Sequence, residues 1–319
     1  MSTVGPVESS VRSGGVRLRL LGPLAIDGVD AIGDRKSRSL LALLAAECGR
    51  PVASDLIIEV LWGDALPAAP ADQISVLVSR LRRVLGAERI VRTDGGYALA
   101  ADWVDVVELD GLVDRAASRL ADGSNASALT SARAAVALVR GPFAAGESAV
   151  WFEERRRTVE RTVLRARSII AEGALAEGDA RTAIAMSEAL RDADPYDEAA
   201  AAMLMRAQVA AGRPSSALAT YAALRQLLAD DLGARPSPEL QRLHGAVLAA
   251  DTSDDEVSES ADDPGLVRLV EALADVEVTG RAAAVVITGD AGAGGSALLA
   301  AFCGLAAQRD ALVLVGRAG

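Results

Sequence analysis

Two similar segments in the middle of the chain begin 34 residues apart, and this spacing restricts the fold more than any other feature of the sequence. The first segment runs from Gly178 to Ile184 and the second from Gly212 to Leu218. A period of about 34 residues is typical of the tetratricopeptide repeat, in which each unit is a helical hairpin. One apolar face of each hairpin is covered only by a neighbouring unit. The spacing therefore predicts an all-α, tetratricopeptide-like domain, placed at residues 108–250, with Pro195 in the first turn of a helix.

Short strand-like runs alternate with helical patterns in the residues before this domain. Residues 16–20 alternate apolar and charged side chains, as a half-buried strand does, and Ser54 is a residue type that commonly caps a helix. The expected elements are strands at 16–20 and 24–26, helices at 37–48, 55–60 and 72–85, and a β-hairpin of 90–93 and 97–99 around a glycine-containing turn. This order predicts a small α+β domain over residues 16–107.

The third of these helices separates an apolar stripe from a basic face. The stripe repeats at helical spacing and is expected to be buried: Ile74, Val78, Leu81 and Leu85. Another face carries Gln73, Val76, Arg80 and Arg83, with Ser79 and Arg82 beside it. An α-helix fits the DNA major groove, and a hairpin with Arg92 at its base can reach the adjacent minor groove or backbone. The alternative is a solvated helix in an arginine-rich protein.

The overall charge limits where nucleic acid could bind. The 319 residues carry a formal net charge of −11, which excludes a surface that is basic throughout but leaves room for one basic patch. Nearly all the basic residues are arginine, Lys36 being the one lysine, and with the abundant alanine this indicates a GC-rich, actinobacterial genome. No apolar run is long enough to span a membrane. Residues 1–15 are predicted to be disordered rather than a signal peptide, so a cytoplasmic, nucleoid-associated protein is expected.

Two further segments follow the helical domain. Residues 251–265 are polar and acidic with no basic residue, and they are predicted to form a linker. Residues 266–319 return to an α/β pattern, with a glycine-rich loop between an expected strand and an expected helix, which is where a P-loop lies. Gly295 occupies the position of the Walker lysine. The loop is therefore interpreted as a degenerate P-loop in a partial domain, with no cofactor bound, formed by Gly289, Gly294, Gly295 and Ser296.

The order and spacing of residues 16–105 resemble the winged-helix DNA-binding domain of OmpR/PhoB-type response regulators, and more closely that of the AfsR/SARP family, the Streptomyces antibiotic regulatory proteins. The motifs that carry this resemblance are Arg35–Leu44, Leu61-Trp62-Gly63, Ser79–Arg83 and Gly96-Tyr97. Those that resemble the family's bacterial transcriptional activator domain are Trp151–Arg156, Ala229–Gly233, Pro236–Leu240 and Leu243-His244. No receiver domain precedes the winged helix, so no phosphorylated aspartate is expected.

The resemblance implies a mainly α protein with a small α+β part: a winged helix-turn-helix, an all-α domain, and a partial α/β fragment like the start of a STAND ATPase domain. It also implies an activator that binds double-stranded DNA as a homodimer on direct repeats and recruits RNA polymerase through the sigma factor. In that mode the family's DNA contacts fall on eight residues: Val76 and Arg80 at base edges, Arg82 and Arg83 at phosphates, Arg92 and Thr93 in the wing, and Gln73 and Ser79 on the same helix face.

Other classes of function have less support. A STAND-type ATP-responsive switch requires a lysine at position 295 and a second Walker carboxylate, and both are missing. A tetratricopeptide-like interaction module would leave the arginine-rich helix and the hairpin unexplained. An enzyme is not expected, because His244, the one histidine, has neither a nucleophile nor metal-ligating residues nearby. Glu153 and Glu154 are interpreted as solvated helix charges, and no metal site is expected.

Overall fold

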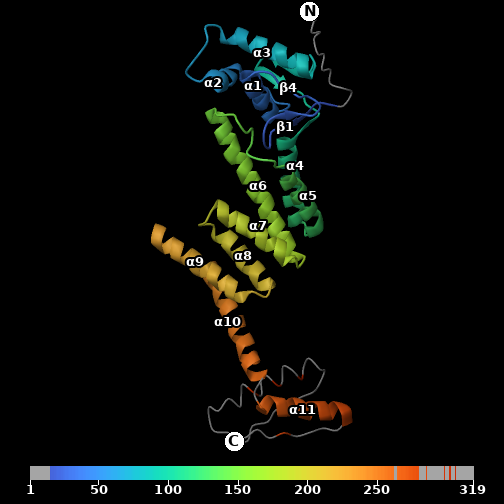
Figure 1. Ribbon diagram of the computed structural model, residues 1–319, viewed down its shortest axis with the longest axis vertical. Coiled ribbons are helices and arrows are strands. Elements are labelled where there is room, and N and C mark those ends of the chain that lie inside the picture. Colours follow the sequence, from blue (N-terminus) through green and yellow to red (C-terminus); the bar gives the residue numbers. More distant parts are fainter. Residues whose placement is uncertain are drawn as a thin grey trace, which may run out of the picture. The chain divides into compact units, whose positions relative to one another are not determined.

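The computed structural model describes residues 15–261 and 264–279, together with residues 285, 298, 302 and 306. The chain divides into two compact units, Met1–Ala211 and Gly212–Gly319. The described residues are mainly helical with small sheets (Figure 1), which confirms the predicted fold class at this level. The residues of the predicted P-loop lie outside the described residues: Gly289, Gly294, Gly295 and Ser296.

The first unit begins with the predicted α+β domain. Its elements are β1 (Arg17–Arg19), β2 (Ala25–Ile26), α1 (Arg35–Ala46), α2 (Ser54–Trp62), α3 (Pro70–Leu85), β3 (Ile90–Thr93), β4 (Gly96–Leu99) and β5 (Trp103–Val104). β2 pairs antiparallel with β1, which also pairs in parallel with β5, while β3 and β4 form a separate hairpin. Strand pair, three helices and terminal hairpin follow in the predicted order.

Local chemistry explains where the three helices begin and end. The side chain of Asp34 caps α1 by accepting a hydrogen bond from the Ser37 backbone at 2.9 Å. The prediction that Ser54 caps α2 is wrong by one position, because Ser54 is the first helical residue and Ala53 the cap. Pro70 starts α3, where its missing N–H costs nothing, and Gly86 ends it with a φ of 112°. The predicted stripe of α3 is buried, together with Leu77.

The hairpin of β3 and β4 is anchored to the segment between α1 and α2. Val52 and Tyr97 exchange two backbone hydrogen bonds, of 2.8 and 3.0 Å. A Cβ on Gly96, whose φ is 135°, would lie 2.0 Å from the Val52 carbonyl oxygen, so only glycine fits at this position. Arg92 pairs with Tyr97, one step from the tip formed by Thr93 and Gly96. The placement of Arg92 at the hairpin's base is therefore corrected: the turn is tighter than the sequence indicated.

β5 was not foreseen, because two residues are too few to show a strand alternation. It adds to β1 by a parallel pairing of distant segments, Arg17 with Trp103 and Leu18 with Val104. The guanidinium of Arg17 also lies over the ring of Trp103, 4.4 Å from its centroid. The next helix begins at Asp105, before the 107/108 boundary placed from the sequence.

The rest of the first unit is helical. It contains α4 (Asp105–Ala121), α5 (Asn125–Ala137), α6 (Val150–Ala176), α7 (Ala180–Ala193) and α8 (Glu198–Ala210). α6 packs against α4, α5, α7 and α8 in turn (Figure 1). One cluster of buried apolar residues is continuous from β1 to α8, so the α+β domain and these helices share a core.

The two repeated glycines, Gly178 and Gly212, adopt the same backbone conformation between two helices. Gly178 and Gly212 both adopt a left-handed φ, of 79° and 70°, just after a helix ends and before the next begins. Asp179 then caps α7 by accepting a hydrogen bond from Thr182 at 3.1 Å. Pro195 was predicted to lie in the first turn of a helix. It lies in the turn between α7 and α8 instead, because Asp197 is the residue that caps α8.

The second unit contains α9 (Pro214–Leu232), α10 (Pro238–Ala261) and α11 (Pro264–Thr279). Gly233 ends α9 in a left-handed conformation, and His244 stacks on Tyr221 with centroids 4.0 Å apart, a packing role as expected. The predicted linker differs from the structure, since residues 251–261 continue α10 and α11 covers residues 264–279. Each residue that extends an established helix adds one backbone hydrogen bond, so polar composition alone does not end a helix.

No helix within the described residues combines the length and apolarity needed to cross a bilayer.

Candidate nucleic-acid interface

The polar face of α3 stands clear of the core. Of the eight residues predicted to bind DNA, six are exposed: Gln73, Val76, Ser79, Arg80, Arg83 and Arg92. Val76 exposes 51% of its surface, although a large apolar side chain on an amphipathic helix is ordinarily turned inward. The helix is held from behind by its buried stripe, so its outer face is presented on a rigid support.

Arg83 and Arg92 keep their cationic groups available. Neither makes an ion pair or a side-chain hydrogen bond within the described part of the chain. Arg83 lies in the last turn of α3 and Arg92 on β3. A guanidinium that is not already engaged can contact a phosphate without first losing a protein partner.

Arg80 is held by an acid from another helix. Its Nη1 lies 2.8 Å from Oδ2 of Asp34, and the two side chains are 52% and 53% exposed. The Asp34 carboxylate also caps α1. The hydrogen bonds from Ser37 and the nearby charge of Arg80 lower the pKa of this carboxyl. Among the described residues the contact with Asp34 engages one nitrogen of Arg80 and leaves Nε and the second Nη without a protein partner. Arg80 can therefore still donate two parallel hydrogen bonds to the edge of a base.

Two of the predicted residues instead hold the hairpin in place. Arg82 is half-buried and donates two hydrogen bonds, from Nε and Nη2, to the Ile90 carbonyl oxygen at 2.9 and 2.6 Å. The hydroxyl of Thr93 donates to the Gly96 carbonyl oxygen at 3.3 Å. Arg82 thus ties α3 to β3, and Thr93 closes the tip of the hairpin. The structure brings all eight residues to α3 and the hairpin, where Arg80 pairs with a carboxylate and Arg82 and Thr93 bond backbone carbonyl oxygens.

Sequence reasoning missed two residues at the start of α1. Asp34 could have been recognised as a helix cap, since an acid three residues before Ser37 is a common capping signal, but its pairing with Arg80 joins positions 46 apart. Arg38 is exposed on α1 and donates to the Gly33 carbonyl oxygen at 3.4 Å. It adds a cation next to the Asp34 cap.

A buried carboxylate fixes β1 to the first helix after the hairpin. Asp105 is 1% exposed and accepts hydrogen bonds from the backbone N–H groups of Leu20 and Leu21 at 2.7 and 2.9 Å. Nη2 of Arg140 lies 3.7 Å from the same carboxylate. Burial raises the pKa of Asp105, against the opposing effect of these donors and of Arg140. This junction orients the sheet on which the α+β domain is built.

The chemistry of this region is that of a binding surface. Among the described residues there is no group of three or more His, Cys, Asp or Glu side chains placed to hold a metal ion. The exposed residues predicted to bind DNA carry arginine, amide, hydroxyl and valine side chains, which bind by hydrogen bonds, charge and contact with a methyl group.

The fold and this face define a winged-helix transcriptional regulator joined to a helical domain. Residues 104–248 match the family model described as "bacterial transcriptional activator domain". The chain is 34% identical over 260 residues to the transcriptional regulator RedD of Streptomyces coelicolor, covering 75% of this chain and 72% of RedD. The chain therefore belongs to the SARP family of transcriptional regulators, and its named relatives are regulators rather than enzymes.

Other relatives include longer proteins. The chain is 32% identical to the regulatory protein AfsR of Streptomyces coelicolor, matching over 88% of this chain but spanning only 29% of AfsR. It is also similar to the solved structure of Mycobacterium tuberculosis EmbR in complex with a low-affinity phosphopeptide, with a TM-score of 0.68 and 29% sequence identity. That similarity covers 74% of this chain and 65% of the EmbR chain.

Proposed function

We propose that the chain is a sequence-specific DNA-binding activator of transcription, with α3 as the recognition helix and the β3–β4 hairpin as the wing. The observation that carries this proposal is the outer face of α3, where exposed Arg80, Arg83 and Val76 lie on a helix whose opposite face is buried. Membership of the SARP family of transcriptional regulators supports this proposal.

The structural contacts support different roles for the individual arginines in DNA binding. Arg80, with its orientation fixed by Asp34, reads a base edge beside Val76, whose methyl groups suit a thymine methyl. Arg83 and Arg92 contact phosphates, and Gln73 and Ser79 extend the same face. Arg82 and Thr93 act mainly by holding the hairpin, with any phosphate contact secondary to that.

The partners are proposed on the same basis. Dimers bind direct repeats in chromosomal DNA in the cytoplasm, and the helical domain with its tetratricopeptide-like hairpins contacts the second copy or RNA polymerase with its sigma factor. The repeated helix–glycine–helix geometry at Gly178 and Gly212 supports this interpretation of the helical hairpins.

Substitution of two arginines on the same helix tests the assignment. We expect Arg80→Ala to reduce the preference for one base pair by about 5-fold to 150-fold, because an arginine–guanine contact contributes about 1–3 kcal/mol of discrimination. Arg83→Ala should weaken binding to all sequences alike and reduce the slope of log affinity against log salt by about one. The measurement is DNA binding at several salt concentrations, on a site and on its single-base variants. Equal binding by both variants and wild type contradicts the assignment.

A further inference from the structure

The outer face of α3 carries one acid among its cations. Asp72 lies in the first turn of this helix and is exposed. Successive residues of an α-helix are about 100° apart, so Asp72 lies within about 40° of Val76 around the helix axis and about 80° from Arg80. Asp72 therefore belongs to the same face as the residues proposed to contact DNA, at the end where the helix begins.

The carboxylate of Asp72 has no partner within the part of the chain that the structure describes. It forms no ion pair and accepts no hydrogen bond, and the cap residue of α3 is Ala69. Arg80 is eight residues further on, about 12 Å along the helix axis, and it pairs with Asp34 instead. The negative charge of Asp72 is therefore not neutralised by a neighbour on this face.

A free carboxylate on a DNA-reading face selects among base pairs, because it accepts hydrogen bonds and donates none. Phosphate oxygens repel it, and the donors in the major groove are the amino groups of cytosine and adenine. The adenine amino group lies between two acceptors, N7 of the same base and O4 of the paired thymine, whereas that of cytosine has an acceptor on one side only. A carboxylate that leaves water without finding a donor loses its hydration uncompensated. Cytosine is therefore the base that suits a carboxylate best.

We propose that Asp72 determines specificity at one base pair of the DNA site, by accepting a hydrogen bond from the N4 amino group of a cytosine. This proposal rests on α3 being the recognition helix. The N-terminal residues of such a helix contact base edges, and Asp72 lies at that end. The rise from Asp72 to Arg80 is about 12 Å, so the cytosine lies about three or four base pairs from the base that Arg80 contacts, at about 3.4 Å per base pair.

The contact adds specificity rather than affinity. Sites that present guanine, thymine or adenine to Asp72 leave its carboxylate against acceptor atoms, and discrimination of this kind comes from rejecting the wrong partner. The arginines of the same face supply attraction to the phosphates of any sequence. Removal of the Asp72 carboxylate should therefore relax the choice of base without weakening binding to the preferred site as much as the loss of a cation does.

An acid in the first turn of a helix has a second effect, on the stability of the helix itself. Its charge interacts favourably with the N-terminal end of the helix dipole, and replacing Asp72 removes that contribution whatever α3 binds. A less stable helix lowers the affinity for all DNA sequences by the same factor. Loss of a contact to one base instead changes the order of preference among the four bases at one position, so that order is the readout.

The experiment uses the full chain and a DNA site that wild type recovers from genomic fragments, with each base pair varied singly. Wild type should prefer cytosine at one position by about 5-fold to 150-fold, the range for a good base contact. Asp72→Ala should reduce this preference to within about twofold. Asp72→Asn should change the preferred base from cytosine to adenine, because asparagine pairs with N6 and N7 of adenine. Both variants should keep the wild-type slope of log affinity against log salt, because Asp72 contacts no phosphate.

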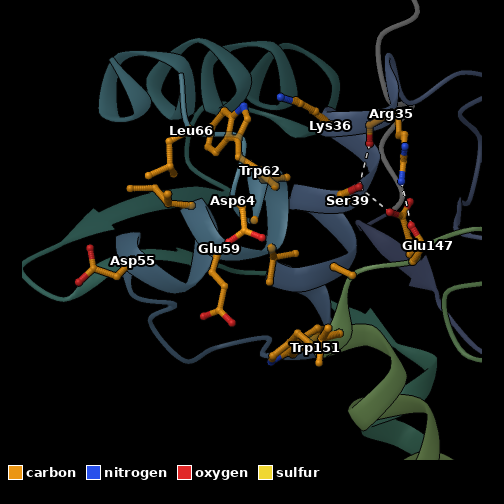
Figure 2. A pocket seen from close by; sticks show the side chains of 17 residues that line it. Arg35, Lys36, Ser39, Asp55, Glu59, Trp62, Asp64, Leu66, Glu147 and Trp151 are labelled. Carbon is orange, nitrogen blue, oxygen red and sulfur yellow. Dashed lines mark hydrogen bonds between the residues drawn. The ribbon is translucent and has the colours of Figure 1, made fainter. Parts of the chain in front are cut away.

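Asp55 provides the matched control. It is exposed in the first turn of α2 and lines a groove formed by α1, α2 and the segment that leads into α6 (Figure 2). Asp55→Asn removes the same charge from the same part of a helix, and it should leave the base preference at every position within about twofold of wild type. Thermal unfolding of each variant shows that the chain remains folded.

Three results would overturn the proposal. The first is an unchanged base preference in both Asp72 variants while Arg80→Ala loses its own base, which leaves α3 as the recognition helix but removes Asp72 from the contact. The second is an equal loss of affinity for all sequences, which assigns Asp72 to helix stability alone. The third is a wild-type preference for guanine or thymine at the position that Asp72→Ala affects. If Arg80→Ala also leaves every preference unchanged, the proposed function fails together with this inference.

Discussion

At the scale of single residues, the pairing of Arg80 with Asp34 links the geometry of one helix terminus to the proposed reading of a base. Asp34 has two tasks, because one oxygen caps α1 and the other holds Arg80. An exposed ion pair contributes at most about 1 kcal/mol to stability. Its value lies in restricting a long side chain before DNA arrives, since the rotamers of arginine are otherwise ordered only on binding.

Two substitutions of Asp34 separate these tasks. Asparagine caps helices as well as aspartate does, so Asp34→Asn should leave thermal stability unchanged but release Arg80. Discrimination at the base pair that Arg80→Ala affects should fall by up to about fivefold, in line with a contact of about 1 kcal/mol, while affinity for other DNA stays the same or rises. Asp34→Ala should in addition lose about 1 kcal/mol of stability. Binding profiles across single-base variants and thermal unfolding are the measurements; discrimination that stays at the wild-type level in Asp34→Asn contradicts the positioning role.

Gly96 provides a second prediction at this scale, with its neighbour as the control. Gly96→Ala would place a methyl group against the Val52 carbonyl oxygen at a positive φ and should cost at least about 2 kcal/mol of unfolding free energy. At Gly95 the nearest atom to an added Cβ is 3.9 Å away, so Gly95→Ala should change stability by less than about 0.5 kcal/mol. Urea unfolding followed by circular dichroism compares them; similar losses in both variants contradict the explanation.

At the scale of elements, the segment between α5 and α6 joins the helices to β1. Leu20 and Leu21 give their N–H groups to Asp105, and their carbonyl oxygens accept from Ala144 and Arg140, each at 2.7 Å. Arg156 on α6 donates to three carbonyl oxygens of the same segment, which accounts for an arginine in the Trp151–Arg156 motif. These contacts are polar and non-local, so no periodicity in the sequence reveals them.

Asp105→Asn tests this junction. An amide offers one acceptor where two N–H groups are buried, so one is left unsatisfied, and we expect a loss of about 1–3 kcal/mol. Burial raises the pKa of Asp105 in the native state, so the folded protein binds more protons than the unfolded chain as pH rises from the ordinary carboxyl pKa. The stability that this group contributes therefore decreases with rising pH through that window. Unfolding at several pH values from about 4 upward measures both effects; an advantage of wild type over Asp105→Asn that grows with pH contradicts them.

At the scale of the whole molecule, local sequence patterns predict some parts of the structure, and contacts between distant segments determine the others. Elements with a strong local pattern were predicted: α3 from its apolar stripe, the hairpin from its glycine turn, and the helical hairpins from the spacing of Gly178 and Gly212. β5, the Asp34–Arg80 pair and the Asp105 junction depend on contacts between distant segments. The polar pattern of residues 251–261 did not exclude helix, because α10 continues there from an established helix.

The same reasoning applies to the candidate site. Its exposed face was identified because an amphipathic helix shows on which side its charges lie, and the family resemblance supplied the role. The distinction between Arg82, which holds the hairpin, and Arg83, which is free, could not be predicted. Adjacent arginines look alike in a sequence, and only the position of the Ile90 carbonyl oxygen separates them.

Affinity selection tests whether the outer face of α3 reads DNA sequence. Fragments of GC-rich actinobacterial genomic DNA are selected with the wild-type chain and with Arg80→Ala, and the recovered sites are then titrated with salt. Wild type should enrich a short motif in direct repeats one helical turn apart, with affinity falling steeply as salt rises, and Arg80→Ala should lose the motif. Recovery of no motif by wild type, or of the same motif by both proteins, would contradict this role of α3.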